Sequence, residues 1–320
     1  MMEDLINASK IALRDCMNLQ TEESLLIVTD EKKLNIGQAF YLAGKEMTKD
    51  ILLIEIPVGA YNGAEPPEIA TELMSRYNVI VAPTSTSLTH TDARRNACKH
   101  GARVGTLPGI TEDIMARTLS ADYKKIKERT LKLSELLSKG KIVRVTTELG
   151  TDITMPIEGQ KVISSTGIVD KPGTFGNLPS GESYLTPIEG QTNGVFVVDA
   201  SMAGIGKIND KPIKITVENG MAVKIEGGKE AKLLNEQVEK NGPKARNIAE
   251  LGIGTNDKAQ VTGLILEDEK VMGTVHIALG NNISMGGTVD VPYHVDGILL
   301  KPTVYLDDKL IMKDGKLLME

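Results

Sequence analysis

The chain has no tryptophan, and aromatic residues make up only 3% of its 320 residues. Its hydrophobic core must therefore be aliphatic, and few rings remain on which nucleic-acid bases could stack. The two cysteines, Cys16 and Cys98, lie far apart and form no CxxC motif. This excludes a cysteine-based zinc site and suits a reducing cytosol, so we expect a cytoplasmic protein.

Long hydrophobic runs are also missing. No stretch reaches the roughly 18 apolar residues of a membrane span, and the first 19 residues lack the apolar core of a signal peptide. The formal net charge of −6 argues against a general binder of polyanions. We therefore expect neither a membrane nor a nucleic acid as partner, and a peptide or small molecule as substrate.

The order of hydrophobic segments predicts two domains. In residues 1–145, apolar strands such as 24–30 and 51–58 alternate with helices, one of them capped by Asn35, which is typical of an open parallel α/β domain. Residues 146–320 contain short strands and glycine turns, with one helix at about 229–241. Asn219 and Gly220 predict a tight hairpin turn there. We expect this β-rich, mixed α+β domain to carry the catalytic site.

Candidate metal ligands gather in residues 271–307, which hold two of the four histidines. His276 lies on the polar face of an alternating strand pattern. His294 and Asp296 are two residues apart, so in an extended segment their side chains point to the same side. Two imidazoles and a carboxylate can form one face of a metal coordination sphere. The alternative is that each of these residues has a structural role.

Two glutamates lie in settings that could complete such a site. Glu182 is flanked by prolines and a glycine in GNLPSGESYLTP, and Glu250 precedes a glycine-rich apolar segment in AELGIGTN. Alone, the first could be a solvated loop residue and the second a carboxylate at a helix end. With His276, His294 and Asp296, they form a sensible ligand set for two divalent cations.

GNLPSGESYLTP, AELGIGTN, GTVHIALG and HVDGILLKPTVYLD occur in this order in the aminopeptidase T and aminopeptidase S family, which this chain resembles. The resemblance implies a homodimeric metallo-aminopeptidase with two zinc, cobalt or manganese ions. The family's five metal ligands fall on Glu182, Glu250, His276, His294 and Asp296.

The peptidases carry a tyrosine shortly after the strand histidine. Ile283 aligns with that tyrosine here. Tyr293, beside His294, is a possible replacement in catalysis, and the alternative is a structural tyrosine.

The chain also resembles a related branch, the 2,5-dihydroxypyridine 5,6-dioxygenases. There the resemblance implies one iron(II) on His276, His294 and Asp296, and a histidine base from the N-terminal domain, which His90 would match. Two arginines in the predicted helix after His90, Arg94 and Arg95, could bind a substrate carboxylate or could be surface charges.

Three functional hypotheses follow. The preferred one is a leucyl aminopeptidase or aminopeptidase T type of metalloprotease, a hydrolase that releases N-terminal residues from peptides through a metal-activated water. The alternative is a mononuclear non-haem Fe(II) dioxygenase that cleaves a small dihydroxylated aromatic ring such as dihydroxypyridine. The third is a non-enzymatic protein that has inherited the fold.

Overall fold

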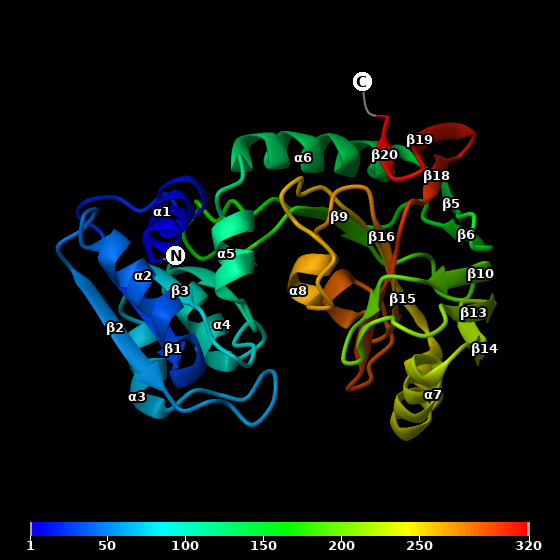
Figure 1. Cartoon of the computed structure of the whole chain (residues 1–320). Coiled ribbons are helices and arrows are strands. Elements are labelled where there is room, and N and C mark those ends of the chain that lie inside the picture. The colour runs from blue at the N-terminus through cyan, green and yellow to red at the C-terminus, as the bar shows by residue number, and fades with distance from the viewer. Residues whose placement is uncertain (1, 319–320) are drawn as a thin grey trace. The chain divides into compact units, whose positions relative to one another are not determined.

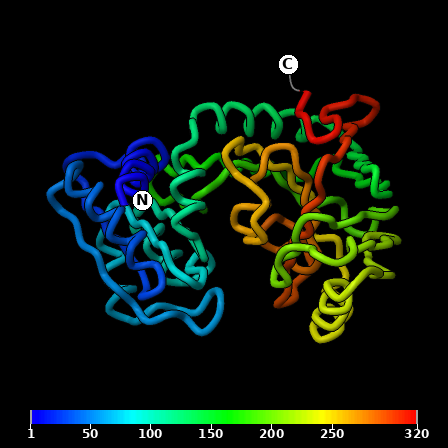
Figure 2. The backbone as a smooth tube through the Cα atoms, in the orientation of Figure 1, coloured from blue at the N-terminus to red at the C-terminus, as the bar shows by residue number. Residues whose placement is uncertain are grey.

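A computed structural model describes residues 2–318. The chain divides into two compact units, each built from two segments. Unit 1 comprises residues 1–127 and 165–180, and unit 2 comprises residues 128–164 and 181–320. The path of the backbone can be followed in Figure 2. The predicted boundary between two domains after residue 145 stays a prediction.

Unit 1 is an α/β layer around a parallel sheet with strand order β2-β1-β3-β4-β8. Its helices and strands are α1 (Met2–Ile11), the π-helical turn η1 (Ala12–Cys16), β1 (Leu25–Asp30), the short turn η2 (Glu31–Lys33), α2 (Leu34–Gly44), β2 (Ile51–Ile56), α3 (Glu68–Met74), β3 (Val79–Ala82), α4 (Asp92–Lys99), β4 (Arg103–Thr106), α5 (Glu112–Thr118) and β8 (Phe175–Asn177).

The core of unit 1 shows why its strands are apolar throughout. Every residue of β1 is buried, as expected of a parallel strand covered on both faces. Leu26 and Val28 pack with residues of α3 and α4. On α2, Gly37 and Gly44 lie against side chains of β1 and β2, where a methyl group would clash. The predicted open parallel α/β layer is confirmed.

Unit 2 is β-rich. The helix α6 (Tyr123–Lys139) leads into it from unit 1. Its further elements, labelled where there is room in Figure 1, are β5 (Ile142–Thr146), β6 (Asp152–Pro156), β7 (Ile163–Ser165), β9 (Glu182–Leu185), β10 (Asn193–Val198), β11 (Ser201–Met202), β12 (Gly206–Lys207), β13 (Ile213–Glu218), β14 (Met221–Glu226), α7 (Lys229–Asn241), η3 (Pro243–Arg246), β15 (Ile248–Gly254), α8 (Ile265–Asp268), β16 (Val275–Gly280), η4 (Ile283–Met285), β17 (His294–Leu299), β18 (Thr303–Leu306), β19 (Lys309–Lys313) and β20 (Lys316–Leu317).

Two sheets of unit 2 enclose one aliphatic core. One has the order β14-β13-β10-β6-β5-β18-β19-β20 and the other β12-β11-β17-β16-β15-β9-β7. Ile215 of the first sheet and Leu251 and Ile277 of the second belong to the same buried cluster. The mixed α+β character predicted for the second half is confirmed. The predicted hairpin is also present, since Asn219 and Gly220 both have positive φ between β13 and β14.

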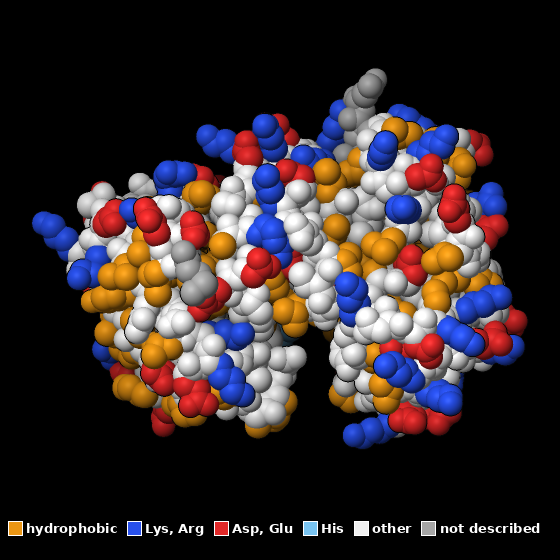
Figure 3. Space-filling view, viewed as in Figure 1, with side chains coloured by type: hydrophobic (Ala, Val, Ile, Leu, Met, Phe, Trp, Pro, Cys, Tyr) orange, Lys and Arg blue, Asp and Glu red, His pale blue; other side chains and the backbone are white. Residues whose placement is uncertain are grey.

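Neither the surface nor the helices are unusual in their polarity. Lys and Arg side chains are interspersed with Asp and Glu on the face in Figure 3, so neither sign of charge gathers into one patch on that face. Within residues 2–318, no helix has the length and apolar character needed to cross a membrane.

Candidate metal centre

The centre of the site is the face of the sheet β17-β16-β15-β9 that is turned away from the aliphatic core. Pairing places Glu250 of β15 opposite Ala278 of β16, and Ala278 opposite Asp296 of β17. Residues paired in this way point to the same face. Because Ala278 carries only a methyl group, the carboxylates of Glu250 and Asp296 can converge above it.

A β-bulge gives Glu250 its orientation. The register of β15 against β16 shifts between Ile248 and Glu250. Ile248 and Leu251 both belong to the aliphatic core, although strict alternation would turn one of them outward. The extra residue in the strand allows both to face the core while Glu250 faces the site.

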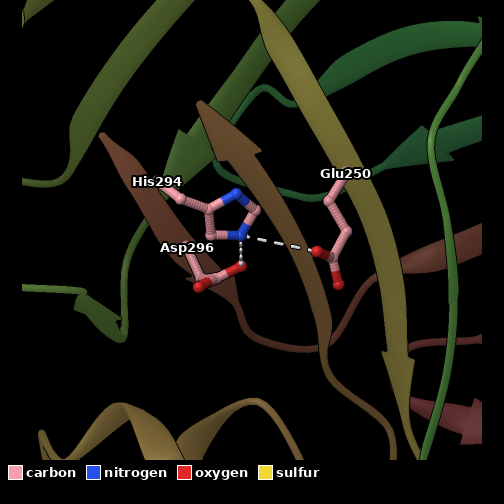
Figure 4. Close-up of side chains that lie close together, drawn as sticks. All are labelled: Glu250, His294 and Asp296. Atoms are coloured by element: carbon pink, nitrogen blue, oxygen red, sulfur yellow. Dashed lines mark ion pairs between the residues drawn. The ribbon is translucent and has the colours of Figure 1, made fainter. Parts of the chain in front are cut away.

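Glu250, His294 and Asp296 form a compact group of metal donors (Figure 4). One ligand atom from each lies within 4.8 Å of the other two. The Nε2 atom of His294 is 3.4 Å from Glu250 Oε2 and 3.5 Å from Asp296 Oδ1. Imidazole and carboxylate donors suit divalent iron, zinc, cobalt and manganese. The residues present therefore fit a divalent metal ion.

The backbone fixes the direction of His294. Its Nδ1 atom lies 2.7 Å from the carbonyl oxygen of Asn281. A carbonyl can only accept, so Nδ1 carries a proton and Nε2 is directed toward the two carboxylates. Such a partner on the far nitrogen is a regular feature of metal-binding histidines.

His276 lies in the next row of the same face. Its Nε2 atom is 3.2 Å from Glu250 Oε1 and 3.6 Å from Glu182 Oε2. The ring lies against Gly252, its partner on β15, where a Cβ atom would be only 2.0 Å from Nε2. The absence of a side chain at Gly252 is therefore what accommodates the imidazole.

The electrostatics of the group follow from its burial and its neighbours. Burial raises the pKa of Asp296, but His294, His276 and Lys270 together have the opposite effect and lower it to about 2. Burial likewise raises the pKa of Glu250, and its contacts with His276 and His294 bring it below its ordinary value. Without a metal ion, the protonated imidazoles are the cations that balance these carboxylates, so metal binding must release protons.

Glu182 is brought to the edge of this group. It begins β9 and pairs with Gly254 of β15. Burial raises the pKa of its carboxyl group above the ordinary value. One of its oxygens accepts a hydrogen bond from Lys270, at 2.6 Å. Lys270 and Tyr184, which pairs with Gly252, were not singled out in the sequence. Only their positions in the sequence could have indicated them, since Lys270 precedes the strand of His276 and Tyr184 follows Glu182.

Tyr293 is separated from the group. It precedes His294 and therefore points to the other face of β17. Its hydroxyl donates to Gln237 of α7, at 3.2 Å, and its ring packs against the aliphatic core. Ile283, at the position of the peptidase tyrosine, is 48% exposed.

His90 lies in unit 1, in the loop between β3 and α4, and its side chain is exposed. The residues on either side are tied to α4. The carbonyl of Thr89 accepts from Arg94 Nε at 2.7 Å, and Thr91 caps the helix by accepting from the backbone N–H of Arg94. Arg94 is buried and stacks on Phe175, whereas Arg95 is exposed.

A pocket of about 380 Å³ lies at the carboxyl ends of β1, β2 and β3 in unit 1. Its lining includes Asp30, Ile56, Thr84 and Leu88. Open α/β sheets bind ligands at this edge, where the strand order reverses.

Comparisons with known proteins identify the relatives of this chain. The family model described as 2,5-dihydroxypyridine 5,6-dioxygenase matches residues 4–319. A 2,5-dihydroxypyridine 5,6-dioxygenase from Pseudomonas putida is 27% identical over 240 residues, which cover 71% of this chain and 68% of that protein.

Two solved structures share the fold. The 2,5-dihydroxypyridine dioxygenase from Pseudomonas putida KT2440 superposes with a TM-score of 0.85 at 20% identity, covering 100% of this chain and 98% of the other. Wild-type AmpT from Thermus thermophilus superposes with a TM-score of 0.70 at 16% identity, covering 99% of each chain.

These matches correct the functional prediction. The preferred assignment as a metallo-aminopeptidase, hydrolase and protease is wrong, because the family model and the sequence relative both point to the dioxygenases. The motifs behind that prediction lie in strands of a fold that AmpT and the dioxygenase both share with this chain, so they could not separate the two chemistries. The chain belongs to the 2,5-dihydroxypyridine 5,6-dioxygenase family.

Proposed function

We propose that this protein is a metal-dependent dioxygenase that cleaves a small dihydroxylated aromatic ring such as dihydroxypyridine. The observation that carries the proposal is membership of the dioxygenase family over residues 4–319. The convergent donors Glu250, His294 and Asp296 supply the metal site that such chemistry needs. The expectation of a homodimer remains a prediction.

The proposed metal is a single iron(II) ion. His294 and Asp296 are its ligands in either arrangement, and the third ligand is Glu250 or His276. The distances favour Glu250, because its carboxylate lies within reach of both His294 and Asp296. His276, with Nε2 at 3.2 Å from Glu250 Oε1, then orients that carboxylate.

When bound, iron(II) supplies open coordination positions and the redox chemistry that dioxygen needs to react with a ring. The chain holds the ion through two carboxylates that balance its charge and one imidazole of fixed tautomer. The role of His90 as a base stays a prediction from the family resemblance. In the overall reaction, dihydroxypyridine and one O₂ give a single ring-opened product that contains both oxygen atoms, so no external reductant is consumed.

Oxygen uptake tests the proposal directly. Protein reconstituted with iron(II) under anaerobic conditions is mixed with 2,5-dihydroxypyridine and ¹⁸O₂. We expect one O₂ consumed per ring and a product that carries both labelled atoms. An Asp296→Ala variant should lose turnover and metal, while Asp308→Ala, at an exposed turn, should retain both. A folded, iron-loaded wild-type protein that consumes no oxygen with any dihydroxylated ring would refute the proposal.

Two further variants separate the candidate third ligands. Glu250→Ala should weaken metal binding by more than about a hundredfold if Glu250 is a ligand, and His276→Gln by about tenfold if His276 only orients it. Equilibrium dialysis with Co²⁺ measures both affinities. The reverse order of effects would assign the third position to His276.

A further inference from the structure

A buried lysine lies beside the metal donors. The side chain of Lys270 is 3% exposed, and its ammonium group is 2.6 Å from Glu182 Oε1. The same ammonium donates to the carboxylate of Glu269. A buried charge is tolerated where it is paired and hydrogen-bonded, and here one cation serves two carboxylates.

The backbone holds Lys270 in this place. Lys270 follows α8, and its N–H donates to the carbonyl of Glu267 at 2.9 Å, while its own carbonyl accepts from Asn256 at 2.9 Å. At Gly254 of β15, a Cβ atom would be only 2.1 Å from the carbonyl oxygen of Val271. The segment that carries Lys270 therefore lies directly against the sheet that carries the metal donors.

Glu182 connects the lysine to those donors. Its second oxygen is 3.6 Å from Nε2 of His276, and that same Nε2 is 3.2 Å from Glu250. Glu182 Oε2 is buried and has no hydrogen-bond partner among residues 2–318. Glu182, His276 and Glu250 are the groups that would surround a second cation if Glu250 bridged two metals.

The ammonium group of Lys270 already balances the negative charge of Glu182, where the second cation would bind. Two metal ions that share a bridge lie about 3.5–4 Å apart. A second ion bridged by Glu250 would therefore be bound by Glu182, next to the ammonium group of Lys270. The ion and the ammonium group are both positively charged, and they would repel each other strongly because water is excluded there. Residues 2–318 contain a single group of three donors that meets the distance requirement of a metal site, and it lacks Glu182.

We propose that the Lys270 ammonium takes the place of a second metal ion next to Glu182, so that the chain binds one divalent ion. This inference rests on the metal site of the proposed function. It adds a reason for the number of ions: a side chain of this sequence, rather than the donors themselves, limits the site to one.

Metal stoichiometry tests the inference, with Co²⁺ as the probe and elemental analysis after dialysis as the readout. The wild-type protein should bind one equivalent. Lys270→Met should bind two, with the second at least about a hundredfold tighter than any second binding to the wild type, because the substitution leaves buried carboxylates without their cation. The double variant that adds Glu182→Gln should return to one equivalent, and Lys270→Arg, which keeps the charge, should bind one.

Several results would overturn the inference. These are two tight equivalents in the wild type, or one equivalent in a folded Lys270→Met protein. If Lys270→Met does not fold with or without Co²⁺, Glu182→Gln alone decides: it should keep one equivalent with an affinity within about threefold of wild type, and loss of an equivalent would make Glu182 a ligand. The measurement needs no turnover. One equivalent of Co²⁺ without oxygen uptake by the iron form would refute the proposed function and leave this inference standing.

Discussion

Gly252 is the position at which a single methyl group should disturb the metal centre most selectively. In a Gly252→Ala variant the new Cβ would lie 2.0 Å from Nε2 and 2.2 Å from Cε1 of His276. These separations must open to at least 3.4 Å for ordinary contact. Since His276 is fully buried, its ring cannot rotate into solvent and must move away from β15, the strand that carries Glu250.

The cost has two parts. Overpacking of a well-packed site costs about 1–3 kcal/mol. Loss of the contact at 3.2 Å between His276 and Glu250 removes a hydrogen bond to a charged group, which contributes about 1.5–3 kcal/mol. We therefore expect the free energy of unfolding to fall by about 2.5–6 kcal/mol. We expect metal affinity to fall by about 10–100-fold, because Glu250 loses its orienting partner.

Urea unfolding and Co²⁺ dialysis measure the two effects, and Gly297→Ala is the matched control. Gly297 lies on β17, and its Cβ would point to the other face, 2.5 Å from Val198 Cγ2. This control should lose about 1–3 kcal/mol of stability and keep wild-type metal affinity. If folded Gly252→Ala protein binds Co²⁺ as tightly as the wild type, the argument that Gly252 positions His276 for the metal centre is refuted.

Three further predictions concern stability. Arg103 donates hydrogen bonds to the carboxylate of Glu23. Burial raises the pKa of Glu23, but the contacts with Arg103 and the backbone of Gln20 lower it below its ordinary value. The contribution of the pair is therefore present above about pH 4.5 and is lost as the pH falls through the lowered pKa. Arg103→Met should thus cost about 3 kcal/mol in urea titrations at pH 7, and the cost should shrink as the pH falls through the lowered pKa of Glu23; a cost that does not change with pH would contradict this. Thr91→Ala removes the N-cap of α4 and should cost about 1 kcal/mol in the same assay, and an unchanged midpoint would mean that the cap contributes nothing. Divalent metal at about 100 times its dissociation constant should stabilise the wild type by about 2.7 kcal/mol and leave Asp296→Ala unchanged; equal shifts in both would place the ion elsewhere.

Local patterns predicted elements whose signals are local. The turn at Asn219 and Gly220 and the helix α7 were visible because residue type and spacing determine them within a few positions. Asn35 was predicted as a helix cap, but α2 already begins at Leu34. The Asn35 side chain instead contacts Glu112, 77 residues away. Its role could not be predicted because the partner is distant in the sequence.

The same limit explains the candidate site. His294 and Asp296 share a strand, so their common direction followed from the spacing. The role of Gly252 depends on the register of β15 against β16, and that of Lys270 on a contact with a residue 88 positions away. The chemistry was beyond reach for another reason. AmpT and the dioxygenase share the fold of this chain, so motif order alone identifies the scaffold and not the reaction.

Ala278 lies between Glu250 and Asp296 in the sheet, and this position has a consequence for how family members can diverge. Glu250 and Asp296 stand on strands that are separated by β16, so their backbones lie two strand spacings apart, each about 4.8 Å, while their side chains converge above Ala278. That spacing is fixed by backbone hydrogen bonds, which no side-chain substitution alters. Loops around the sheet can therefore change in length and composition while the backbone separation of the two residues stays constant. The frame that holds the two candidate ligands is in this sense a property of the sheet, and a small residue at the position of Ala278 leaves their side chains room to converge.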